Sequence, residues 1–171
     1  MNRYDRPRVG RYALLAAAAA LAMLGAGCTD AGPARDTDRQ AEVSERGSAV
    51  MPFDLDKTTH LFTKTESGGV QTVTADDPGD SAEADLIQQH LRHEADRFGR
   101  GDFTDPARIH GNDMPGLATL RDSAGKITVN YAATRDGARI TYTTTDVSLV
   151  AALHAWFDAQ VSDHGEHATH G

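Results

Sequence analysis

Two histidines in this sequence are each followed, four residues later, by a carboxylate. The first pair is His90 and Glu94, in the stretch LIQQHLRHEADRF. At helical spacing, Ile87, Leu91 and Phe98 form an apolar stripe, and Glu94 falls inside it. A buried carboxylate must be paired, protonated or metal-bound, because an isolated charge in an apolar interior is costly. The pair is therefore either structural or part of a metal or ligand site.

The second pair is His154 and Asp158, in ALHAWFDAQV. Another histidine, His110, lies in RIHGNDMPG, and loops rich in turn residues often carry function. Neutral imidazoles and carboxylates are suitable ligands for zinc or a similar divalent ion. We therefore predict a metal site made by His90, Glu94, His110 and His154. The alternative is that each histidine has a capping or packing role.

The C-terminal stretch SDHGEHATHG has a histidine at every third position, at His164, His167 and His170. Acidic residues lie between these histidines, so a flexible segment of this kind can wrap one copper, nickel or zinc ion. We predict a histidine-rich tail over residues 163–171 that collects metal. The alternative is a solvated terminus without a ligand.

The N-terminus carries the most specific pattern in the chain. Four arginines precede and flank the start of the apolar run ALLAAAAALAML, which leads to GAGC, and Cys28 is the only cysteine. A basic start, a short apolar core and small residues are typical of a cleaved secretory signal rather than a transmembrane helix. We predict a signal peptide over residues 1–27.

The segment from Leu24 to Cys28 resembles the lipobox of bacterial lipoproteins, whose cysteine is acylated. In the usual pattern a leucine stands three residues before the cysteine, whereas here Gly25 holds that position. The resemblance implies an exported protein that a lipid on Cys28 holds at the membrane of the cell envelope. The alternatives are simple secretion and a cytosolic product that starts at Met51.

Charge and composition narrow the expected partners. The chain has 17 basic and 25 acidic side chains, and removal of residues 1–27 takes away four arginines and Asp5, which leaves a formal charge of −11. Nucleic acid is therefore not an expected partner, whereas a divalent or other small cation is. Residues 28–48 are polar and predict a flexible tether after the lipidated cysteine.

Residues 49–162 are long enough for one ordinary domain. HLFTKT and VQTVTA, joined by ESGG, predict one β-hairpin, and KITVNYAA and ARITYTTT, joined by TRDG, predict another. Asp80 and Asp146 have the position of N-caps for two long helices. Between them, residues 101–116 predict a long loop, which a short helix follows.

The order of these elements is ββα(α)ββα, which favours the α+β class. We expect a two-layer sandwich in which an antiparallel sheet of about four strands carries helices on one face. The segments MPFDLDKTTHLF, GDFTDPARIHGNDMPGL and ALHAWFDAQVSDHG resemble a small bacterial domain family that sometimes carries the label aspartate carbamoyltransferase. The resemblance covers about residues 51–168. The Ser-Thr-Arg-Thr-Arg type motif of that transferase is absent, so no catalytic residue is carried over.

Three functions of different class follow from these observations. The first is an envelope binding module for a divalent metal, such as zinc or copper, or for a small cationic ligand. The second is an interaction domain without a small-molecule site, whose protein partner the sequence does not identify. The third is an enzyme with a pocket around the same residues, although the chain lacks GxSxG, HExxH, P-loop, GxGxxG and CxxC motifs.

Overall fold

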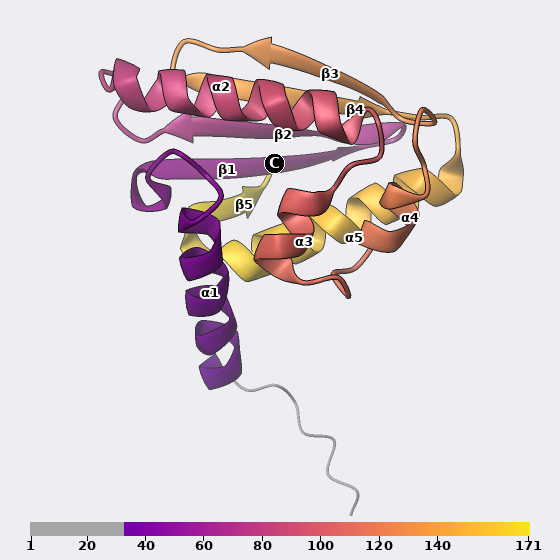
Figure 1. The fold of residues 1–171 in the computed structure, drawn as a ribbon, viewed down its shortest axis with the longest axis horizontal. Helices are drawn as coiled ribbons and strands as arrows, with labels where there is room; N and C mark the ends of the chain where they lie inside the picture. The colour runs from indigo at the N-terminus through magenta and orange to yellow at the C-terminus, as the bar shows by residue number, and fades with distance from the viewer. Residues whose placement is uncertain (1–32) are drawn as a thin grey trace, which may run out of the picture. The chain divides into compact units, whose positions relative to one another are not determined.

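The computed structural model describes residues 33–171, so the predicted signal peptide, Cys28 and the start of the predicted tether lie outside the described residues. The described residues contain one mixed sheet and five α-helices, in an α+β arrangement (Figure 1). The predicted fold class is confirmed at this level. None of the described helices combines the length and the apolar character that crossing a membrane requires.

Two antiparallel hairpins form most of the sheet. In the first, β1 (Thr58–Thr65) pairs with β2 (Gly68–Ala75), and in the second, β3 (Thr128–Ala133) pairs with β4 (Gly137–Thr143). The hairpins join where β2 pairs antiparallel with β4, and the strand order is β3-β4-β2-β1-β5. Both hairpins lie where the alternating sequence pattern predicts them.

The fifth strand departs from the predicted sheet of about four antiparallel strands. β5 (Ala168–His170) pairs in parallel with β1, and a short 3-10 helix, η2 (Gly165–His167), leads into it. Without β5 the edge of β1 would present unpaired backbone groups, and these are satisfied when another strand adds to the edge. Residues 163–171 therefore differ from the expected flexible segment, because they include the end of α5 and a strand that extends the sheet.

Two long helices, α2 (Ser81–Phe98) and α5 (Val147–His164), cover the sheet. Their predicted caps are confirmed, since Asp80 and Asp146 accept hydrogen bonds of 3.1 and 2.9 Å from backbone N–H groups of the first turns. Each side chain satisfies one of the N–H groups that the start of a helix leaves without a partner. The caps fix where both helices begin and hence which side chains they present to the sheet.

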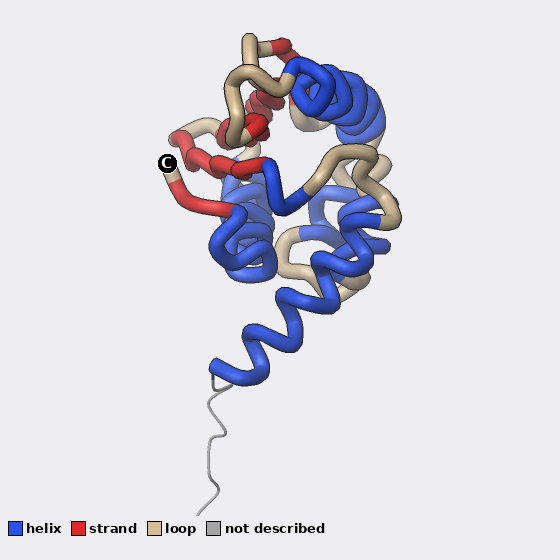
Figure 2. The backbone as a smooth tube through the Cα atoms, turned by 90° about the vertical axis from the view of Figure 1, so that its left-hand side faces the viewer, coloured by secondary structure: helices blue, strands red, loops and turns tan. Residues whose placement is uncertain are grey.

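The core lies between the sheet and these two helices. Phe98 from α2, Trp156 from α5 and Tyr142 from β4 contact one another, with ring centroids 5.8–6.3 Å apart. Because the three rings meet, α2 and α5 pack on the same face of the sheet. In Figure 2 the helices, in blue, lie on one side of the strands, in red. The other face carries partly buried threonines such as Thr72 and Thr74.

Two short helices follow α2. The second, α4 (Leu117–Arg121), is the predicted short helix, whereas α3 (Thr104–His110) lies inside the predicted loop. Asp102 accepts a 3.0 Å hydrogen bond from the backbone N–H of Thr104, and Pro106 falls in the first turn, where a helix tolerates proline. A helix of two turns is stabilised by tertiary burial and shows little periodicity in the sequence.

The chain also forms a helix where the sequence predicts a tether. α1 (Pro33–Ser48) packs against α5 and α3, with Val43 fully buried. Arg39 makes a 2.7 Å ion pair with Asp163, and Arg46 donates to a carbonyl of α3. The tether prediction is wrong over these residues because long-range polar contacts, rather than an apolar stripe, hold the helix in place.

Candidate functional site

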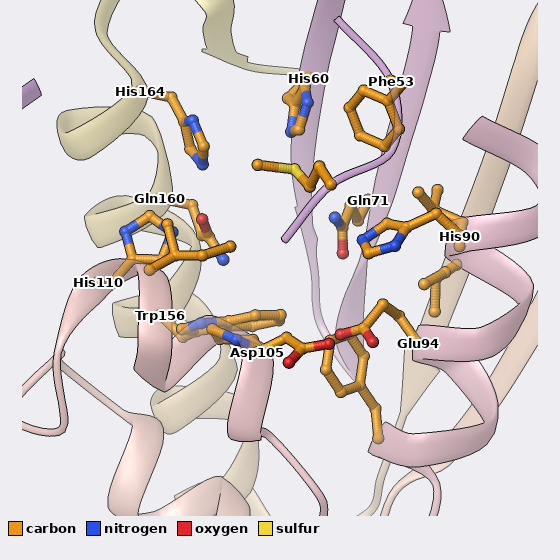
Figure 3. Close-up of a pocket in the computed structure, with 16 residues that line it drawn as sticks. Phe53, His60, Gln71, His90, Glu94, Asp105, His110, Trp156, Gln160 and His164 are labelled. Carbon is orange, nitrogen blue, oxygen red and sulfur yellow. The ribbon is translucent and has the colours of Figure 1, made fainter. Parts of the chain in front are cut away.

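A cavity of about 50 Å³ lies between the sheet, α2, α3 and α5 (Figure 3). This volume admits a few water molecules or a small ligand. The described residues that line it include no serine, threonine or cysteine, so they provide no hydroxyl or thiol nucleophile. They do include nine side chains with hydrogen-bonding groups: His60, Gln71, His90, Glu94, Asp105, His110, Trp156, Gln160 and His164.

One end of the cavity is formed by carboxyl groups. Glu94 is only 5% exposed, and Figure 3 shows its carboxyl group and that of Asp105 pointing toward each other. Arg97 contacts both: its Nη1 lies 3.3 Å from Glu94 Oε1 and also donates to Asp105. The same guanidinium donates from Nε to Asp102 at 2.9 Å. One largely buried cation thus serves three carboxyl groups.

Burial, together with the neighbouring charges, decides the protonation of Glu94. Burial raises the pKa of Glu94 to about 8, the neighbouring Asp105 adds to the rise, and Arg97 opposes it. Hydrogen bonds from Arg97 hold the pKa of Asp102 well below its usual range. Arg108 also approaches Asp105, but at 3.9 Å and with a side chain that is 66% exposed. Glu94 therefore holds a proton at neutral pH.

His90 lines the same cavity one turn before Glu94, so the structure brings this predicted pair to one site. Its ring meets that of Phe53 edge to face, with centroids 5.6 Å apart. Burial lowers the pKa of His90 to about 4, so the imidazole is neutral and one ring nitrogen can accept a hydrogen bond. The charged partner of Glu94 is Arg97 rather than His90.

The other end of the cavity is formed by imidazoles. His60 from β1 and His110 from α3 each have a ring centroid 5.1 Å from that of His164, at the end of α5. Burial lowers the pKa of His60 to about 4 and that of His164 well below its ordinary value. Among the described residues, nothing bonds to the buried Nε2 of His60. The ring of His164 therefore contacts both of the other rings.

A carboxylate outside the cavity orients one of these rings. The Nδ1 of His110 lies 2.8 Å from Asp163 Oδ2, and Arg39 donates to both carboxylate oxygens of Asp163, at 2.7 and 3.1 Å. Burial alone would raise the pKa of Asp163, but hydrogen bonds from His110 and Arg39 lower it to about 2. An ionised Asp163 accepts the Nδ1–H of His110 and thereby orients the ring.

The remaining predicted ligands lie elsewhere. The Nε2 of His154 makes hydrogen bonds of 3.1 and 2.9 Å with the backbone carbonyls of Thr65 and Gly68, away from the cavity. His167 and His170 approach surface aspartates, at 3.7 and 3.5 Å. The cavity thus collects His90, Glu94, His110 and His164 of the predicted set. In residues 33–171, no group of three or more His, Cys, Asp or Glu side chains is arranged to hold a metal ion.

Several site residues have no strong signal in the sequence. His60 alternates with the core residue Phe62 on β1, so the period of two could have placed it on the inner face. Trp156 is a buried residue of α5 whose Nε1 has no partner among the described residues. Asp105 is recognisable only through its contact with Arg97 on the preceding helix, and Asp163 only through Arg39, 124 residues away. Their roles depend on how α3 and α1 pack.

The comparisons with known proteins assign neither a family nor a function to this chain. No protein-family model, curated protein or solved structure matches this chain. The chemistry of the cavity is therefore the basis for a functional proposal. That chemistry has two parts: the carboxyl groups of Glu94 and Asp105 at one end, and the imidazoles of His60, His110 and His164 at the other.

Proposed function

We propose that this protein is a binding module of the cell envelope whose cavity takes a small organic cation at Glu94 and Asp105. The observation that carries the proposal is the burial of Glu94 beside Asp105, with one guanidinium shared among three carboxyl groups, so that Glu94 holds a proton in place of a second cation. A ligand cation can replace that proton. The predicted export signal and Cys28 would place this module at the membrane surface.

The groups around the carboxyl pair suit a primary ammonium. Carboxylate oxygens, the neutral imidazole of His90 and the amide oxygen of Gln71 accept hydrogen bonds, and an ammonium group donates three. Gln71 already accepts one from the Tyr142 hydroxyl at 2.9 Å. The rings of Phe98 and Trp156 also line the cavity, and aromatic faces attract cations. A cavity of about 50 Å³ limits the ligand to a size near that of methylammonium.

The proposal predicts that cation binding is linked to proton release. Methylammonium should bind about tenfold more tightly, or better, at pH 8.5 than at pH 6, because the cation needs Glu94 ionised. The other titratable groups facing Glu94 are Arg97 and His90 on α2, Asp102 and Asp105, and Tyr142 on β4. His90 and Tyr142 stay neutral across this range, so the pH dependence reports on the carboxyl pair.

Isothermal titration calorimetry of the full-length chain with methylammonium chloride, against sodium chloride as blank, measures this binding. Glu94→Gln should abolish it while keeping the side chain's size, and Asp158→Asn on α5 is the matched control that should leave it unchanged. Equal binding by Glu94→Gln, or no binding at either pH, contradicts the proposal. The second result would favour an interaction domain without a small-molecule site.

A further inference from the structure

We propose that His60, His110 and His164 bind a transition-metal ion, zinc or copper, at the imidazole end of the cavity. This site is distinct from the carboxyl pair, and it does not depend on cation binding at Glu94. It differs from the site that sequence spacing predicts: only His110 is shared, and His60 and His164 take the place of His90, Glu94 and His154. The three rings come from β1, α3 and α5, so only the folded chain assembles them.

The spacing of the His164 ring from each of the other two rings suits a shared ion. Two imidazoles that bind one tetrahedral zinc through nitrogens at about 2 Å place their ring centroids about 5 Å apart. The observed separations from His164 are 5.1 Å to His60 and 5.1 Å to His110. Because no three ligand groups are already arranged around one point in residues 33–171, binding requires rotation of the His60 and His164 side chains toward His110.

His60 supplies an independent observation. It is 4% exposed, and its Nε2 has no hydrogen-bond partner among the described residues, although a buried polar atom without a partner is costly. A metal ion at this atom would satisfy it.

His110 has the supporting contact that metal-binding histidines usually have. A carboxylate that accepts the other ring N–H fixes the tautomer and orients the metal-binding nitrogen. Asp163 occupies this position at 2.8 Å from Nδ1, and two hydrogen bonds from Arg39 hold the carboxylate in place. Arg39 belongs to α1, and therefore the helix found in place of the tether supports the site.

The types of ligand narrow the choice of metal ion. Three imidazoles suit zinc and copper better than calcium or magnesium, which prefer oxygen ligands. Met51 lines the same cavity, and a thioether favours copper(I). The test therefore includes both metals, and their order of affinity identifies the preferred ion.

The experiment uses the full-length chain, freed of metal with a chelator and then loaded with zinc(II) or, without oxygen, copper(I). Bound metal is measured by mass spectrometry after desalting, and affinity by competition with a chromogenic chelator. We expect about one ion per chain, with the affinity reduced about tenfold or more in His60→Gln, His110→Gln and His164→Gln. Asp163→Asn, which keeps all three rings, should weaken binding by about tenfold as well.

Three controls separate this site from other places on the chain. His154→Gln removes a histidine of α5 that bonds to backbone, and the double variant His167→Gln with His170→Gln removes the surface histidines; both should bind metal as the wild type does. Glu94→Gln should also keep the metal. Trp156 is the only tryptophan and lines the cavity, so cobalt(II) should quench its fluorescence in every metal-competent variant.

The outcomes separate this inference from the proposed function. Metal uptake that survives the three histidine substitutions, or that the surface double variant abolishes, overturns the inference. Absence of uptake by the wild type overturns it too. Should the cavity histidine variants fail to fold, an unchanged affinity in Asp163→Asn still contradicts the site. If methylammonium does not bind but metal binding follows this pattern, only the proposed function is rejected.

Discussion

α2 and α5 are both 18 residues long, and each carries a histidine followed by a carboxylate one turn later. In α2 the pair is His90 and Glu94, and both side chains line the cavity. In α5 the pair is His154 and Asp158, and neither lines it. The spacing is the same, yet only one of the two pairs contributes to the candidate site.

The difference lies in what each helix face meets. Glu94 is 5% exposed and shares Arg97 with Asp105, whereas the side chain of Asp158 is 54% exposed and contacts Lys64. Burial changes the chemistry of the first carboxyl group by raising its pKa, whereas the second carboxyl group is largely open to water. A local motif therefore defines which groups are adjacent, and the tertiary environment defines what they do.

The largest expected effect that distinguishes the two helices is the pH dependence of stability. Because folding raises the pKa of Glu94, its contribution to stability is fully present below the ordinary pKa of glutamate and is lost as pH rises toward 8. The loss should be on the order of 3 kcal/mol. Glu94→Gln should remove most of this pH-dependent loss, so the variant should be more stable than the wild type at pH 9.

Urea unfolding between pH 5 and pH 9 measures this difference, and Asp158→Asn is the control. The stability of Asp158→Asn should follow the wild-type pH curve, since the carboxylate that this substitution removes is exposed. Parallel curves for the wild type and Glu94→Gln would mean that the Glu94 carboxyl group is solvated in the folded protein. The contrast between the helices would then disappear.

A smaller effect is expected from the histidine of α5. His154→Ala should reduce the free energy of unfolding by about 1 kcal/mol, because the carbonyls of Thr65 and Gly68 lose a donor at the turn between β1 and β2. His154→Gln, which retains a donor, should recover part of that loss. Thermal unfolding at pH 7 measures both, and a change in metal or methylammonium binding would place His154 in the site after all.

The smallest effect should come from the carboxylate of α5. Asp158→Asn should change the free energy of unfolding by less than about 0.5 kcal/mol, because exposed ion pairs contribute little. The partners Lys64 and Asp158 have side chains that are 35% and 54% exposed. Urea unfolding in low and high salt measures the difference, and a larger effect that persists in high salt would show that this pair is not simply a surface contact.

The sequence alone determines the elements whose signals are local. Asp80 and Asp146 cap the helices that follow them, and alternating residues define two hairpins, because a cap or a strand pattern depends on neighbours within a few positions. The α+β class follows from the order of these elements. The placement of Glu94 on the buried side of α2 also follows, from helical periodicity.

The tertiary structure alone decided which distant residues meet. Arg39 and Asp163 are 124 residues apart, and their ion pair holds α1, a segment with little apolar pattern of its own. β5 forms because an open strand edge accepts a backbone of almost any sequence, so no side-chain pattern announces it. His60, His110 and His164 converge for the same reason: their proximity follows from the packing of β1, α3 and α5, and spacing along the chain contains no information about it.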